Sequence, residues 1–262
     1  MKVKSVVKVM NFHALVRVDK ARREAEKLAS MEAKLCGMID SITNNMNLML
    51  DKYILIINQK MPALNIYIGS DMGFCGGYNY VVNENAFKDK DADKILVGKK
   101  LWGNIDNVVM SISKEDYLNN PKPLDDLLMD GILNGKYSQI NVLYNEYVNS
   151  STIKWNCKRV YPFEFDSESD SSNYHEDIVC ETDINDLIRK MIVTYIGFEV
   201  AITTINSLAS ENIMRENSTS ESLKKIDEIE EEQKLKERKR MSTKNFEKLI
   251  ETYSKQKFVN GK

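Results

Sequence analysis

Apolar residues in the first 57 positions recur at alternating steps of three and four, the spacing of a helix that packs along one seam. The seam runs from Val7 to Met49 and is interrupted at Arg17 and Glu24. A second series lies one residue later, as expected because a 3.6-residue helix drifts against a 3.5-residue repeat. The first series is Val7, Met10, Ala14, Ala21, Leu28, Met31, Leu35, Met38, Ile42 and Met49, and the second is Val18, Ala25, Ile39, Met46 and Tyr53. The pattern predicts one helix over residues 2–57, roughly 80 Å long at 1.5 Å per residue.

A second helical pattern covers residues 183–258, with Gly197 as its only glycine. Its first third carries an apolar face of Ile184, Leu187, Met191, Phe198, Ile202, Ile205 and Leu208. Residues 224–240 then hold 13 charged residues in 17, acidic first and basic afterwards. Pairs four residues apart, such as Glu232 with Lys236, can keep this stretch helical in water. We expect a solvated helical face here, and contact with an acidic partner through the basic half is the alternative.

Helix-breaking residues concentrate in the middle of the chain. All four prolines lie between Pro62 and Pro162, and eight of the eleven glycines lie between Gly69 and Gly135. Proline and glycine are costly inside helices, so long helices at both ends of the chain are compatible with a turn-rich domain between them.

The middle region alternates between strand and helix patterns. Strands are expected at 64–70, 140–148 and 153–163, helices at 78–88 and 123–137, and a strand followed by the start of a helix at 94–105. This alternation predicts a small, largely parallel, Rossmann-like α/β domain. The chain should therefore combine an α/β fold with a long coiled coil. Its terminal helices would pair antiparallel as a shaft, with segments 1–58 and 183–262 flanking a globular domain at 59–182.

Composition excludes several functions. The formal net charge is −2, from 37 basic and 39 acidic residues, so the chain has no excess of positive charge that would indicate nucleic-acid binding. No run of about 18 apolar residues occurs, which argues against direct membrane insertion. Cys36, Cys75, Cys157 and Cys180 are far apart in the sequence and form no C-x-x-C pair. They therefore predict neither a disulfide framework nor a zinc site.

The stretch "IGSDMGFCGGYN", residues 68–79, is the best candidate for chemistry because glycine-rich turns after strands often cradle phosphates. Its glycines do not follow G-x-G-x-x-G, and "GILNGKY" at 131–137 does not follow the P-loop pattern. A nucleophilic Cys75 would need a histidine. The only two are His13, in the first helix, and His175, in an acidic loop. We therefore expect a packed, inert thiol, no metal site and no cofactor.

Three stretches resemble the gamma subunit of F-type ATP synthases. Residues 68–79 are similar to the family's S-D-x-G-L-C-G-G-x-N stretch, with Phe74 in place of leucine, and "SLASENIMRE" at 207–216 is similar to its S-L-A-S-E-x-x-A-R-M element. Residues 6–22 match a third, N-terminal run. The signature residues carried by the first two stretches are Ser70, Asp71, Gly73, Cys75, Gly76, Gly77, Ala209, Ser210, Glu211 and Arg215.

The resemblance implies a non-catalytic central stalk that couples ion flow through a membrane ring to ATP synthesis or hydrolysis. Its partners would be three alpha and three beta subunits, an epsilon subunit and the c-ring, at the cytoplasmic face of the cell membrane. Shaft contacts are expected at Lys8, Met10, Arg17 and Lys20, and contacts with acidic loops at Lys236, Arg238, Lys239 and Arg240. Met241, Phe246, Leu249 and Tyr253 would form the tip in an apolar sleeve.

Two alternatives share the helical pattern. One is the gamma-like shaft of a specialised rotary ATPase, since the stretch after Arg215 is more charged than is usual in the family. The other is a coiled-coil scaffold or secretion stalk. A scaffold would explain the two helices, but not the two signature stretches in the family's order.

Overall fold

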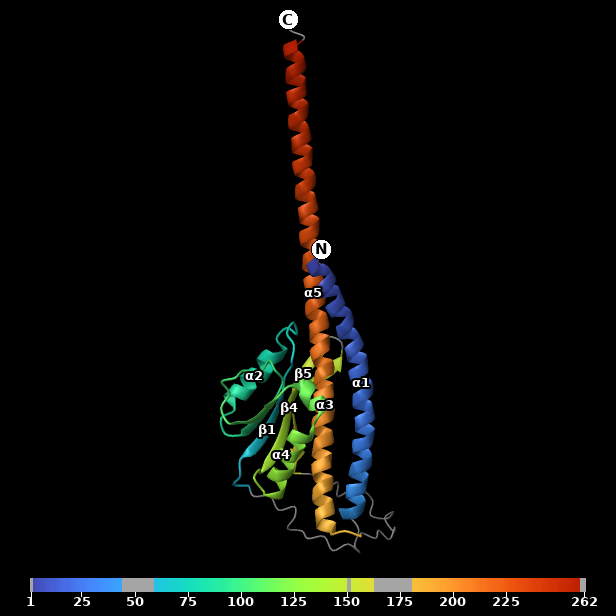
Figure 1. Ribbon diagram of the computed structural model, residues 1–262, viewed down its shortest axis with the longest axis vertical. Helices are drawn as coiled ribbons and strands as arrows, with labels where there is room; N and C mark the ends of the chain where they lie inside the picture. The colour runs from blue at the N-terminus through green and yellow to red at the C-terminus, as the bar shows by residue number, and fades with distance from the viewer. Residues whose placement is uncertain (1, 44–58, 150–151, 163–180, 260–262) are drawn as a thin grey trace.

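Two long helices form an antiparallel pair beside a small globular foot (Figure 1). The computed structural model describes residues 2–43, 59–149, 152–162 and 181–259. Helix α1 spans Lys2–Thr43 and helix α5 spans Ile184–Val259. The C-terminal part of α5 extends well past the N-terminus of α1, so the shaft narrows from two helices to one. This arrangement confirms the predicted combination of a coiled-coil shaft and an α/β domain.

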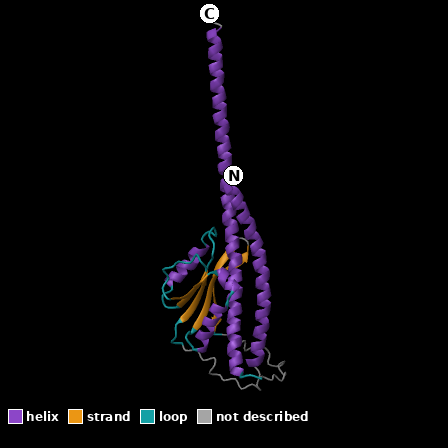
Figure 2. Cartoon of the chain, viewed as in Figure 1, coloured by secondary structure: helices purple, strands orange, loops and turns teal. Residues whose placement is uncertain are grey.

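The foot contains one five-stranded sheet in the order β3-β2-β1-β4-β5 (Figure 2). Three neighbouring pairs are parallel, and β4 and β5 form an antiparallel hairpin. The strands are β1 Ala63–Ile68, β2 Asp93–Val97, β3 Val108–Ile112, β4 Gln139–Asn149 and β5 Thr152–Tyr161. The helices are α2 Tyr78–Lys88, α3 Lys114–Asn119 and α4 Lys122–Leu133. The largely parallel sheet is as predicted.

Side chains that alternate along the strands divide the foot into layers. On β1, Leu64, Ile66 and Ile68 enter the larger core, which also includes residues of α4, α5 and the end of α1. Tyr67 points to the other face, where Val82 and Ala86 of α2 form a smaller core. The shaft, together with α3 and α4, therefore covers the face of the sheet that carries Leu64, Ile66 and Ile68.

The helix expected to start within residues 94–105 is absent. After β2 the chain turns at Gly98, with φ of +137°, and residues 98–107 form turns and bends that lead into the edge strand β3. Strand β3 and helix α3 were not predicted. The start of α3 did carry a signal, because Ser113 caps the helix by accepting a hydrogen bond from the Asp116 backbone N–H at 2.9 Å.

The seam of α1 differs from the predicted one. Ala14, Val18, Ala21, Ala25, Ile39 and Ile42 are buried and Leu28 and Leu35 are half-buried, a single heptad series with steps of four and three. Arg17 and Glu24 lie outside this series and do not interrupt it, and Met31 and Met38 are 48% and 58% exposed. Small residues explain which face of α1 is buried. Ala21 and Ala25 pack against Ile205 and Ala209, where a long methionine would hold the helices apart.

Helix α5 changes character along its length. By length and hydropathy it could span a membrane, but 56% of its most apolar window is buried inside the fold. Packing against the sheet and α1 therefore accounts for this apolar stretch. From residue 231 to 252 every side chain is exposed. We call residues 231–259 the free helix.

Several predictions fall outside the described residues. They concern the first helix after Thr43, with Met46, Met49 and Tyr53, and the acidic loop with His175. Cys180 also lies outside. The domain boundaries stay predictions.

Candidate functional site

The loop of residues 68–79, which we call the signature loop, adopts an unusual backbone conformation. Phe74 and Gly76 have φ of +61° and +55°, in the left-handed region that glycine tolerates and phenylalanine disfavours. A Cβ on Gly76 would also lie 3.3 Å from Met214 Cε of α5. Phe74 holds its strained conformation while it is 72% exposed. The loop thus packs on α5 through glycine and presents an aromatic ring to the outside.

Asn79, in the first turn of α2, closes the signature loop. The Ser70 backbone N–H donates to Asn79 Oδ1 at 3.0 Å, and Asn79 Nδ2 donates to Ser70 Oγ at 2.7 Å. Cys75 is buried beside them, with Sγ 3.6 Å from Ser70 Oγ, and burial raises the pKa of its thiol. A buried thiol with a raised pKa is a weak nucleophile, which argues against a catalytic role for Cys75. His13, a candidate partner in the sequence, lies exposed on α1.

Asp71 joins the signature loop to the neighbouring strand ends. Its carboxylate accepts hydrogen bonds from the backbone N–H groups of Lys99, Lys114 and Glu115 at 2.9, 3.0 and 2.9 Å. Partial burial acts to raise the pKa of Asp71, but these three bonds and the charge of Lys114 outweigh it, so the pKa lies below its ordinary value. The carboxylate therefore acts as a structural anchor.

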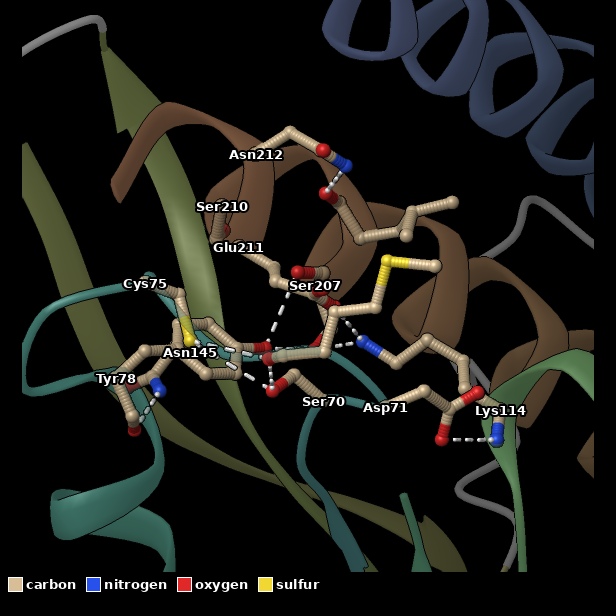
Figure 3. A network of polar contacts seen from close by, with 12 residues as sticks. Ser70, Asp71, Cys75, Tyr78, Lys114, Asn145, Ser207, Ser210, Glu211 and Asn212 are labelled. Carbon is tan, nitrogen blue, oxygen red and sulfur yellow. Dashed lines mark hydrogen bonds and ion pairs between the residues drawn. The ribbon is translucent and has the colours of Figure 1, made fainter. Parts of the chain in front are cut away.

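A buried ionic network joins the foot to α5 (Figure 3). Glu211 lies between two cations, with Lys114 Nζ 3.0 Å from Oε2 and Arg215 Nη2 2.6 Å from Oε1. All three side chains are at most 5% exposed. Arg215 Nε also donates to the Gly73 carbonyl at 3.3 Å. We call Lys114, Glu211 and Arg215 the buried triad.

Tyr78 strengthens the same joint. Its hydroxyl contacts the Ser207 hydroxyl and donates to the Ser207 carbonyl oxygen at 3.1 Å, and its ring centre lies 5.8 Å from Lys114 Nζ. Asn145 of β4 donates from Nδ2 to the Tyr78 carbonyl at 3.1 Å. Residues of the signature loop, α2, α3 and β4 are thus tied together at one stretch of α5, residues 207–215.

The location of this network in the sheet explains what it can do. In doubly wound sheets, ligands bind beyond the carboxyl ends of the strands where the strand order reverses, which here is between β1 and β4. Ser70 follows β1, and Asn145 lies two residues beyond the last paired residues, Tyr67 and Leu143. Arg215 of α5 donates to the Gly73 carbonyl, and the Ser207 carbonyl of α5 accepts from the Tyr78 hydroxyl, so α5 packs over the loops at this edge of the sheet.

The structure brings most of the signature residues together. Ser70, Gly73, Cys75, Gly76, Glu211 and Arg215 meet at the joint, and Asp71 lies beside it. Ala209 packs toward α1 instead, and the Ser210 hydroxyl bonds to the Asn206 carbonyl at 3.2 Å. Gly77 precedes α2 with an ordinary φ of −79°.

Sequence reasoning missed Lys114, Ser207 and Tyr78 as partners of these residues. Tyr78 and Ser207 lie inside the two signature stretches, so their positions were open to inference. Lys114 gave no signal, because nothing in the sequence marks a lysine as buried.

Two of the four predicted shaft residues, Met10 and Arg17, line a groove between α1 and the signature loop. The groove has a volume of about 540 Å³, and its lining includes Met10, Arg17, Met72, Phe74 and Lys100. Arg17 Nη1 lies 3.9 Å from Met72 Sδ. Lys8 and Lys20 are exposed on α1. The groove thus combines apolar side chains with the cations Arg17, Lys100 and Arg215 and the one carboxylate of Asp71.

The predicted acidic-loop contacts and the predicted tip residues all lie on the free helix. Lys236, Arg238, Lys239, Arg240, Met241, Phe246 and Leu249 are all exposed, and Tyr253 lies in the helix at a position whose side chain is not described. Lys236 Nζ is 3.6 Å from Glu232 Oε2, as expected for residues four apart. Within the described ranges, no three His, Cys, Asp or Glu residues gather as metal ligands.

Comparisons with known proteins agree over most of the chain. The sequence profile of a family described as ATP synthase matches residues 1–251. The ATP synthase gamma chain of Ureaplasma urealyticum is 26% identical over 260 residues, covering 89% of this chain and 88% of that one. That of Clostridium pasteurianum is 25% identical, covering 86% and 83%.

Solved structures show the same fold. The central stalk of the Tetrahymena thermophila mitochondrial ATP synthase is similar with a TM-score of 0.60 at 16% identity, covering 83% of this chain and 99% of that chain. A chain of the Euglena gracilis mitochondrial ATP synthase is similar with a TM-score of 0.51 at 12% identity, covering 94% of both chains.

Proposed function

The chain belongs to the ATP synthase family as a gamma subunit, and from this premise we propose how its shaft contacts the rest of the complex. A gamma subunit is a non-catalytic rotor, the central stalk of a membrane-associated complex. We propose that three alpha and three beta subunits surround the shaft, and that epsilon and the c-ring hold the foot at the cytoplasmic face of the membrane.

The free helix carries this proposal. Every side chain from 231 to 252 is exposed, with Met241, Phe246 and Leu249 between 59% and 67%. Isolated helices draw little stability from propensity alone and gain most of it by packing an apolar face. Large apolar side chains on an unaccompanied helix therefore favour a surrounding partner, here an apolar sleeve of alpha and beta subunits.

The first turns of α1 support the same surroundings. Val3, Val6, Val9, Phe12 and Val16 are between 52% and 69% exposed, while Lys4 and Asn11 of the same turns contact α5. Apolar residues thus face outward and polar residues face the helix partner, the reverse of an ordinary coiled coil. A partner surface on the outside would bury the apolar side.

The groove fits an acidic loop that also carries an apolar side chain. Arg17 and Lys100 line it together with Met10, Met72 and Phe74, and the carboxylate of Asp71, which also lines it, is held by three backbone N–H groups. We assign Met10 and Arg17 to direct contact, and Lys8 and Lys20 to electrostatic attraction along the same helix. Torque would then pass from foot to shaft through the buried triad, because breaking a buried ion pair is costly.

The basic stretch Lys236, Arg238, Lys239 and Arg240 is proposed to meet acidic loops of the catalytic subunits. Replacing all four by glutamate should lower rotation-coupled ATPase activity of the assembled complex, since attraction becomes repulsion. The matched control replaces the acidic residues Glu228, Glu231 and Glu237 by lysine. Unchanged activity and torque in the four-residue variant would refute this contact.

Co-purification tests the whole proposal. A tagged chain expressed in its native cell should bring down alpha and beta subunits in three copies each, together with epsilon and the c-ring in detergent. A chain stopped after Arg240 should retain epsilon and the c-ring but bind the alpha and beta subunits more weakly. A monomer without partners would contradict the assignment of contacts.

A further inference from the structure

Helix α5 contains a weak stretch directly above the buried triad. Residues 217–222 read Asn-Ser-Thr-Ser-Glu-Ser, and five of these six have side chains that compete with the helix backbone for hydrogen bonds. The Thr219 hydroxyl donates to the Arg215 carbonyl at 2.8 Å, and the Ser222 hydroxyl to the Ser218 carbonyl at 2.8 Å. Such bonds slightly destabilise and bend helices. Intrinsic propensity therefore gives α5 little support just where it leaves the foot.

The N-terminal end of α1 contacts α5 within this stretch and further along the helix. Asn11 Nδ2 lies 3.1 Å from the Glu216 carbonyl oxygen, 3.0 Å from Thr219 Oγ1 and 2.9 Å from Ser220 Oγ. One heptad earlier, Lys4 Nζ lies 2.5 Å from Asp227 Oδ1 and 2.7 Å from Glu230 Oε2. Lys4 and Asn11 continue the seam that Val18 and Ala25 occupy lower down.

These contacts differ in kind from the rest of the seam. From Ala14 toward the C-terminal end of α1, the helices meet through alanine, valine and isoleucine. From Ala14 toward the N-terminus of α1, the only apolar seam residue is half-buried Val7, between Asn11 and Lys4. A polar residue at a seam position fixes register at a cost in stability. Asp227 and Glu230 of the acidic half therefore pair with Lys4 within the chain, and the basic half beyond them stays exposed.

We propose that residues 4–11 of α1 act as a splint for residues 216–230 of α5. The splint holds the weak stretch helical and in register by the polar contacts of Asn11 within it and of Lys4 further along α5. In the rotor, this makes the shaft above the foot a segment whose stiffness depends on α1. That last consequence rests on the proposed function, whereas the splint itself does not.

Amide hydrogen exchange of the purified full chain tests the splint without any partner subunit. In the double variant Lys4→Gln, Asn11→Ala, amides of residues 217–230 should exchange about tenfold faster, because local opening no longer breaks contacts with α1. Amides of residues 191–213 should be unchanged. The control Lys27→Gln, Ser30→Ala alters exposed positions of the same helix and should change neither region.

A rescue variant separates a splint from a general loss of folding. Adding Ser218→Ala and Ser222→Ala to the double variant strengthens the weak stretch, because alanine is the best helix former. Exchange of residues 217–230 should then return to within about threefold of the wild type. Equal exchange in wild type and double variant, faster exchange throughout the foot, or a failure of the alanines to restore protection would each overturn the proposal.

Discussion

Glu211 is the residue on which the joint between foot and shaft depends most. Glu211→Ala leaves Lys114 and Arg215 buried without an anion, so we expect the free energy of unfolding to fall by about 3–5 kcal/mol. Urea denaturation would measure the change. Glu221→Ala, at an exposed position on the same helix, should stay within about 0.5 kcal/mol. A loss at Glu211 no larger than at Glu221 would contradict the role of the triad.

Asp71 gives the joint a predicted acid sensitivity. Its folded pKa lies below the ordinary value of 3.8, so its contribution is present above that value and is lost as pH falls through the folded pKa. Asp71→Asn should therefore be less stable than wild type at pH 7, with the difference shrinking below about pH 4. Urea titrations between pH 7 and about pH 2.5 would check this. A constant difference across that range would show that Asp71 does not act through its charge.

Single residues also mark the limit of sequence reasoning. The family resemblance identified Ser70, Glu211 and Arg215 as signature residues, but it did not predict that they meet; the structure shows that they do. Lys114 could not be found, since its burial depends on how α3 packs beneath α5, and the sequence around it shows only a helix cap.

At the scale of elements, alanine substitutions at two glycines separate the effect of helix propensity from the effect of packing. Gly37 in α1 has open space where an added Cβ would lie, so Gly37→Ala should stabilise the chain by about 0.5–1 kcal/mol. Gly131 in α4 would place its Cβ 2.7 Å from the Tyr137 ring, so Gly131→Ala should destabilise it despite the same gain in propensity. Thermal unfolding of both variants tests the sign. Stabilisation by both would mean that Tyr137 moves freely aside.

The seam shows why an element can be predicted while its face is not. A heptad pattern that starts at Val7 can place its second apolar position either three or four residues further on. The sequence offers apolar residues for both choices, such as Met38 and Ile39 after Leu35. Periodicity therefore predicts a helix with a seam but does not choose the register. Close contact with Ala209 and Ile205 on a helix far away in sequence decides it.

At the scale of the whole molecule, the free helix should be dispensable for folding. Residues 231–252 bury no side chain, so a chain ending at Arg240 should keep its free energy of unfolding within about 0.5 kcal/mol. Urea denaturation monitored by tryptophan fluorescence would report the foot, which contains Trp102 and Trp155. A chain ending at Ser222 also loses Asp227 and Glu230 and serves as the comparison. If both truncations lowered the free energy of unfolding equally, the loss would come from the residues after Arg240, which would indicate that the tip contacts the foot.

The crevice of a doubly wound sheet ordinarily receives a molecule that arrives, reacts and departs. In this chain the segment that covers that edge is α5, which contacts Gly73 and Lys114 and is covalently continuous with the sheet. The local concentration of such a segment is set by the chain itself and does not fall on dilution. A free nucleotide would have to compete with a ligand that is never released. The edge of the sheet at which related folds bind and release ligands is here permanently covered by α5. A rotor that must transmit force in every cycle requires such a permanent contact.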